Sequence, residues 1–95
     1  MAAKKKYVLE RKYTKVGAYL KEMREKSGLT QREVSIDLGY SSAQFISNFE
    51  NGIAVPPLKK LRSLVRIYGM SPDKVMDLVI DTQREIMQDA LKIRR

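Results

Sequence analysis

The chain has 95 residues, of which 43% are hydrophobic, so it has the length of one small domain and the composition of a globular one. It contains no cysteine and no histidine, so we expect no disulfide, no metal site, no cofactor and no enzyme activity, and the sequence offers no evident small-molecule site. Lys and Arg number 19 against 11 Asp and Glu, and the net charge of +8 favours a polyanionic partner.

The first 13 residues form a basic segment ahead of any helical pattern. Their only acid is Glu10, and their bases are Lys4, Lys5, Lys6, Arg11 and Lys12. Chain termini are commonly solvated and disordered, which is one interpretation of this segment. The other is a basic arm that folds onto phosphates or lies in a groove of nucleic acid.

Glycine and proline divide the rest of the chain into five stretches with helical apolar spacing, and no stretch alternates as a strand would. Thr14 is the expected N-cap of a first helix that runs to about Lys26. Thr30 and Glu33 have the spacing of a capping box, which predicts the start of a second helix. We therefore expect an all-α fold with five helices.

The third helix is expected to follow a cap at Ser41 or Ser42 and to end near Asn51. Pro56-Pro57 suits the first turn of a fourth helix, and Ser71-Pro72-Asp73 is a strong helix start for a fifth.

The fifth helix is expected to be long, because neither glycine nor proline occurs between Pro72 and about Arg94. Such a helix would measure about 34 Å at about 1.5 Å per residue. One side of it carries apolar residues at spacings of threes and fours, namely Val75, Val79, Ile86, Ala90 and Ile93. A stripe of this kind usually covers its own domain, but a small bundle is too short to cover all of this one. We therefore predict a homodimer through this region, with residues 14–80 forming the domain and 81–95 an extension.

Residues 30–51 have the pattern of two short helices joined by a tight turn, the unit that places a helix in the major groove of DNA. Val34 and Leu38 would face inward from the first helix, and Ile46 and Phe49 from the second. Gly39 ends the first helix, where a left-handed residue lets the chain turn sharply.

The segment resembles the helix-turn-helix of Cro/C1-type, lambda-repressor-like regulators (the XRE family). The marks are Leu29-Thr30-Gln31, the small Ser35, Leu38-Gly39, and Ile46-Ser47 followed by Phe49-Glu50-Asn51-Gly52. With Met23-Arg24 upstream and Pro56 downstream, the resemblance covers about residues 16–76. It implies sequence-specific binding of double-stranded DNA and a role in transcription, as a repressor rather than an activator.

The resemblance also implies roles for individual residues. The side of the recognition helix that faces the groove would carry Ala43, Gln44, Ser47 and Asn48, of which the two amides suit the edge of adenine. Contacts to the DNA backbone would come from Gln31, Arg32, Ser42, Asn51, Lys59 and Lys60. For Gln31, the amide could bridge either a phosphate or the recognition helix. Arg24 and Glu50 match a family ion pair that is structural and fixes the recognition helix against the first helix.

Two departures from the family pattern affect these roles. The turn at Tyr40-Ser41-Ser42 is one residue longer than in most members, so the recognition helix could begin one position away from its usual place. Were Ser41 the cap, Gln44 would complete a capping box and be less free to read bases. The loop Ile53-Ala54-Val55 lacks the basic residues of many members, so contacts to phosphate would have to come from basic residues elsewhere in the chain.

A second hypothesis keeps the fold and changes the partner. The same domain could act as an antitoxin or an adaptor that binds protein. Attachment to a membrane surface is less favoured, because the basic segment has no strong amphipathic character. No apolar run has the length of a membrane span and no signal-peptide core follows the basic start, so we expect a cytoplasmic protein that associates with the nucleoid through DNA.

Overall fold

The computed structural model describes residues 11–92 of the chain, and this part is all helical. Its five helices are α1 (Thr14–Lys26), α2 (Gln31–Asp37), α3 (Gln44–Glu50), α4 (Leu58–Tyr68) and α5 (Pro72–Leu91). The expected all-α class and the number of helices are confirmed.

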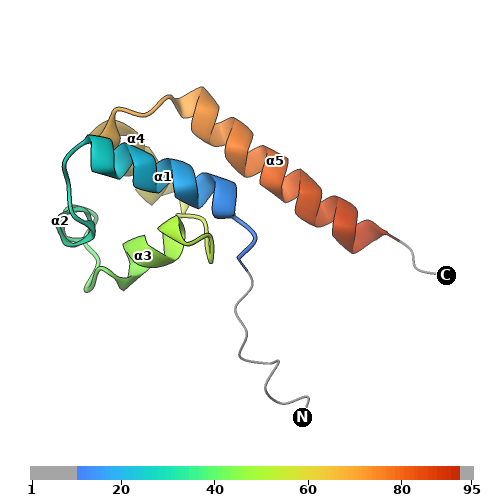
Figure 1. Cartoon of the computed structure of the whole chain (residues 1–95), viewed down its shortest axis with the longest axis horizontal. Coiled ribbons are helices and arrows are strands. Elements are labelled where there is room, and N and C mark those ends of the chain that lie inside the picture. Colours follow the sequence, from blue (N-terminus) through green and yellow to red (C-terminus); the bar gives the residue numbers. More distant parts are fainter. Residues whose placement is uncertain (1–10, 93–95) are drawn as a thin grey trace, which may run out of the picture.

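The helices pack around α1, which lies across α3, α4 and α5 (Figure 1). The short helices α2 and α3 form one end of the molecule, and α5 runs back along α1 and extends past it. The core takes one to three residues from each helix and one from each of the α2–α3 and α4–α5 connections: Val16, Leu20, Val34, Leu38, Ile46, Phe49, Leu61, Leu64, Tyr68, Met70 and Val75. Burying these side chains is the main force that holds short helices together.

Local sequence sets most helix boundaries as expected. The Thr30 hydroxyl accepts a hydrogen bond from the Glu33 amide, and the Glu33 carboxylate accepts one from the Thr30 amide. This capping box fixes the start of α2. Ser71 caps α5 by accepting from the Lys74 amide. The glycines that follow the first four helices, Gly28, Gly39, Gly52 and Gly69, have positive φ.

The start of α1 differs from the expectation, because Tyr13 and not Thr14 is the N-cap. The Tyr13 amide donates to the Gly52 carbonyl, and the Tyr13 carbonyl accepts from the Gly17 amide. This tertiary contact draws Tyr13 into the capping position, and no side chain caps the helix.

The third helix begins later than expected, at Gln44 after Ala43. Residues 41–43 are a turn, in which the Ser42 hydroxyl accepts from the Gln44 amide at 3.3 Å. The extra residue of the linker is therefore accommodated before the helix, and neither serine is its N-cap. Similarly, Pro57 is the N-cap of α4 and not part of its first turn.

The fifth helix ends at Leu91, with Lys92 in an extended C-cap conformation. It has 20 residues, so it is about 30 Å long and shorter than expected. Ile93 and the arm residues Lys4, Lys5 and Lys6 lie outside the described residues.

Candidate nucleic-acid interface

The α2–α3 pair is held by apolar packing and by a tight turn. Val34 and the small Ser35 are buried under α3, and Gly39 turns the chain with a φ of 79°. The Tyr40 amide then donates to the Ser35 carbonyl at 2.9 Å. These contacts set the angle between the two helices, which leaves one side of α3 facing solvent.

The solvent side of α3 carries four polar side chains and no charged one. Gln44 and Asn51 are exposed, whereas Ser47 and Asn48 are half-buried. The two exposed amides each donate a hydrogen bond to a side chain one helical turn away: Gln44 Nε2 to Asn48 Oδ1 at 2.8 Å, and Asn51 Nδ2 to Ser47 Oγ at 3.2 Å. The face is therefore an ordered row of amides and hydroxyls. Pairing between the two amides expected to read bases was not foreseen from the sequence.

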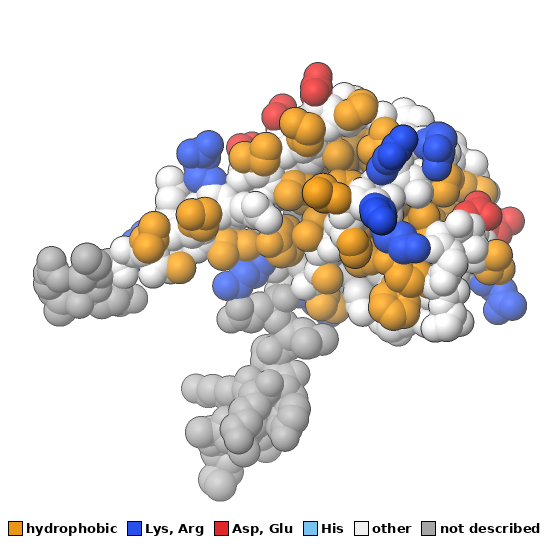
Figure 2. All heavy atoms as spheres, turned by 180° about the vertical axis from the view of Figure 1, so that it is seen from behind, with side chains coloured by type: hydrophobic (Ala, Val, Ile, Leu, Met, Phe, Trp, Pro, Cys, Tyr) orange, Lys and Arg blue, Asp and Glu red, His pale blue; other side chains and the backbone are white. Residues whose placement is uncertain are grey.

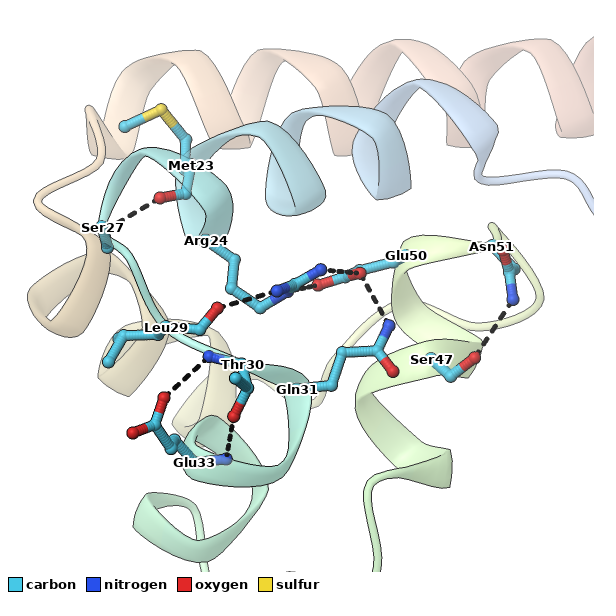
Figure 3. Close-up of polar contacts among 10 residues, drawn as sticks. All are labelled: Met23, Arg24, Ser27, Leu29, Thr30, Gln31, Glu33, Ser47, Glu50 and Asn51. Carbon is cyan, nitrogen blue, oxygen red and sulfur yellow. Dashed lines mark hydrogen bonds and ion pairs between the residues drawn. The ribbon is translucent and has the colours of Figure 1, made fainter.

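Beneath this face, a buried ion pair joins α3 to α1 (Figure 3). Two nitrogens of Arg24 donate to the Glu50 carboxylate: Nε to Oε2 at 2.6 Å and Nη2 to Oε1 at 3.2 Å. The remaining nitrogen, Nη1, donates to the Leu29 carbonyl at 2.8 Å. The side chains of Arg24 and Glu50 are 11% and 3% exposed. The hydrogen bond to Glu50 raises the pKa of Arg24, so the guanidinium stays protonated. The structure thus brings together the arginine and glutamate that the resemblance had paired.

Gln31 joins the same network from the first turn of α2. Its Nε2 donates to Glu50 Oε1 at 2.9 Å (Figure 3). Of the two roles open to this amide, a bridge to α3 is the one present in the structure. Glu50 therefore accepts hydrogen bonds from both α1 and α2, and these fix the roll of α3 about its own axis.

The side chain of Tyr68, from α4, lies near the Arg24–Glu50 pair. It is buried, and burial together with the nearby charge of Glu50 raises the pKa of its phenol well above the usual range. No pattern in the sequence predicts that Tyr68 lies near Glu50.

The basic residues expected to bind phosphate differ in their exposure to solvent. Arg32 and Lys59 are exposed, and so are Arg11 and Lys12 of the arm. Lys60 is half-buried: its Nζ donates to the Leu38 carbonyl at 2.6 Å and lies 5.1 Å from the centre of the Tyr40 ring. Lys60 therefore ties α4 to the end of α2.

An aromatic stack flanks the start of α3. The rings of Tyr40 and Phe45 lie 4.4 Å apart and are nearly parallel. Phe45 remains 43% exposed although its ring stacks on Tyr40. Ile36 and Ala43 line a neighbouring hollow of about 270 Å³ together with Arg32 and the turn.

The apolar stripe expected to form a dimer lies largely on the domain itself. Val75 is in the core, and Val79 and Ile86 are half-buried. Val75 is therefore unavailable to a partner, which corrects that part of the prediction, while Ala90 is exposed. The periodicity was right for a helix face, but this face is the one that packs inward.

A pair of short helices, a tight turn and an outward row of amides held by a buried ion pair together define a helix-turn-helix domain. A family model described as helix-turn-helix domain matches residues 15–78, about two thirds of the chain. The chain belongs to this family, which is part of the Cro/C1-type group. A helix-turn-helix domain implies DNA binding, typically in the regulation of transcription.

Comparison with curated proteins and with solved structures finds no match. Within residues 11–92, no helix combines the length and the apolar character that crossing a membrane requires.

Proposed function

We propose that the protein is a sequence-specific regulator of transcription that binds double-stranded DNA with α3 in the major groove. The observation that carries this proposal is the solvent face of α3. Its side chains are polar and uncharged, and the contacts of Arg24 and Gln31 with Glu50 hold the helix in one orientation. Hydrogen-bonding groups at fixed positions are what direct reading of base edges requires.

Gln44 and Asn48 are the proposed base readers, because an amide donor and acceptor match the adenine edge. With the bond between them in place, Gln44 supplies the acceptor and Asn48 the donor. Ala43 is placed next to them for contact with a thymine methyl group, and Ser47 can bond to any base. Contacts that fix the register on the duplex are assigned to Ser42, Asn51, Arg32 and Lys59. Gln31 is assigned to the same group through the second N–H of its amide, since the first is donated to Glu50. Lys60 is the weakest of the proposed phosphate contacts, because its ammonium already donates to the Leu38 carbonyl and lies over the Tyr40 ring.

The basic arm is proposed to bind DNA next to the recognition helix. The Tyr13 amide is bonded to the Gly52 carbonyl at 3.0 Å, so the arm leaves the domain beside the C-terminal end of α3. Five bases and one acid lie within its 13 residues. Such a segment supplies affinity for phosphate without sequence preference.

The protein is further proposed to act as a homodimeric repressor inside the cell. Two recognition helices related by a two-fold axis would read half-sites about 34–36 Å apart, which predicts a palindromic operator. Repression requires only that the protein occupy such a site.

Selection of bound sequences from random duplex DNA, at near-physiological salt, tests the proposal. Gln44→Ala is expected to relax base choice at one position by about 1–3 kcal/mol, whereas Asn51→Ala is expected to weaken binding to all sequences alike. Recovery of no consensus, or of one that Gln44→Ala leaves unchanged, would show that α3 does not read bases through Gln44.

The role of the arm is tested by salt dependence. Lys5→Gln is expected to reduce the slope of log K against log salt by about 0.9. Arg66→Gln is the matched control, because Arg66 is exposed in the last turn of α4. The connection that follows this turn, between α4 and α5, lies away from α3 (Figure 1). Equal slopes for the two variants would remove the arm from the DNA contact.

A further inference from the structure

The outward face of α5 is apolar and has no cover within the described residues. Met76, Ile80, Met87 and Leu91 recur at spacings of four, seven and four, which places them on one side of the helix. They are 52%, 47%, 61% and 73% exposed, whereas the buried Val75 and Thr82 lie on the opposite side of α5. Figure 2 shows hydrophobic side chains that follow α5 and continue onto the body of the domain.

Two hollows extend this surface. One, of about 370 Å³, lies along the second half of α5 between Ile80 and Leu91. The other, of about 270 Å³, lies between α4 and the first half of α5 and includes Met76 and Leu58, which is 83% exposed. An apolar surface of this extent on a small domain indicates an interface.

The charges on α5 indicate what covers it. The first half carries exposed Asp73, Asp77 and Asp81, none of which forms an ion pair within the described chain. The second half carries Arg84 and Lys92 together with the acids Glu85 and Asp89, which pair with Lys15 and Lys92, so Arg84 is its one base without an ion pair among the described residues. A second α5 in antiparallel orientation would bring Arg84 of each chain near the acids of the partner's first half and would oppose the two helix dipoles. A parallel α5 would set the three acids of one chain against the same acids of the other.

We propose that a second copy of this chain covers the face, with the two α5 helices antiparallel. The midpoint of Met76 and Leu91 coincides with that of Ile80 and Met87, between Gln83 and Arg84. A two-fold axis at that point sets Met76 against the partner's Leu91, and Ile80 against the partner's Met87. Near the axis, Arg84 lies within reach of the partner's Asp81. This interface rests on the dimer of the proposed function and names the surface that forms it.

The oligomeric state of the full chain tests this interface. Sedimentation equilibrium over the micromolar range is expected to show two chains, and Met87→Glu is expected to raise the dimer dissociation constant at least about tenfold. Ile36→Glu is the matched control, because it puts the same charge on an isoleucine of α2 that is 64% exposed. Arg84→Glu is also expected to weaken the dimer, and the double variant Asp81→Lys with Arg84→Glu is expected to restore it.

The orientation is tested by crosslinking, which is clean because the chain has no cysteine. Chains with Met76→Cys, mixed with chains with Leu91→Cys, are expected to form a mixed disulfide, and neither variant alone is expected to crosslink. Crosslinking of Met76→Cys with itself would overturn the antiparallel arrangement. A single chain at all concentrations, with or without DNA, would overturn the interface altogether.

Failure of the proposed interface can be distinguished from failure of the proposed DNA recognition. A single chain that still selects a specific half-site would refute the interface and leave base reading intact. A dimer that selects no sequence would do the reverse.

Discussion

Glu50→Gln is the sharpest test of how this domain holds its recognition helix. The change keeps the shape of the side chain and removes its charge. Glu50 accepts three hydrogen bonds, at 2.6 and 3.2 Å from Arg24 and at 2.9 Å from Gln31. An amide can accept at one oxygen only, so its nitrogen would meet a donor of Arg24 at close range. The Arg24 charge would then lie in the interior without a counter-charge.

Breaking a buried pair by removing one partner costs about 3–5 kcal/mol. The whole free energy of unfolding of a small domain is about 5–15 kcal/mol, so the loss is a large part of it. At about 4–8 °C per kcal/mol, we expect Tm to fall by about 12 °C or more.

Thermal unfolding followed by circular dichroism measures the change. Glu25→Gln is the matched control, because Glu25 is exposed on the same helix as Arg24 and forms no ion pair within residues 11–92. Replacing both partners, with Arg24→Leu and Glu50→Leu, is expected to cost less than Glu50→Gln alone. A Tm for Glu50→Gln within a few degrees of the Glu25→Gln value would refute the assignment of Glu50 as the anchor of α3.

Three further predictions concern other contacts of the domain. Gly17→Ala would place a Cβ closer to the Glu50 carbonyl oxygen than van der Waals contact allows, so we expect α1 and α3 to separate and stability to fall by about 3 kcal/mol or more, measured by urea unfolding. Thr30→Ala should cost about 1 kcal/mol in the same assay, and Thr30→Ser should restore the cap and most of the loss. The raised pKa of Tyr68 means that, above about pH 10, the unfolded state loses a proton that the folded state keeps. Stability should therefore fall with rising pH by up to about 1.4 kcal/mol per unit from this group, and Tyr68→Phe should remove that part of the slope; equal slopes would contradict it.

Local rules predicted the helices whose boundaries depend on local contacts. The Thr30–Glu33 capping box and the Ser71 cap need only residues within one turn, and both occur as expected. Thr14 failed as a cap because the boundary of α1 is set by a hydrogen bond to Gly52, 39 positions away from Tyr13. Such long-range contacts leave no mark in the local sequence.

The sequence predicted which residues belong to the candidate site better than it predicted the hydrogen bonds between them. The resemblance paired Arg24 with Glu50, but not Gln31 with the same carboxylate. Lys60 looked like a surface base, yet its stem and ammonium bridge α4 to the turn, which charge alone could not reveal. On α5, periodicity identified an apolar face at Val75, but the exposed face at Met87 also has helical spacing. Only the packing against α1 decides which of the two is inside.

The hydrogen bond between Gln44 and Asn48 means that the two amides act as one chemical unit. The bond uses one Gln44 donor and the Asn48 acceptor, which leaves an acceptor on Gln44 beside a donor on Asn48. Replacing either residue changes what the other can offer, so the effects of the two single substitutions on base preference would not add. A change of operator would therefore require substitution at both positions together, and a variant altered at only one position would discriminate poorly between DNA sequences.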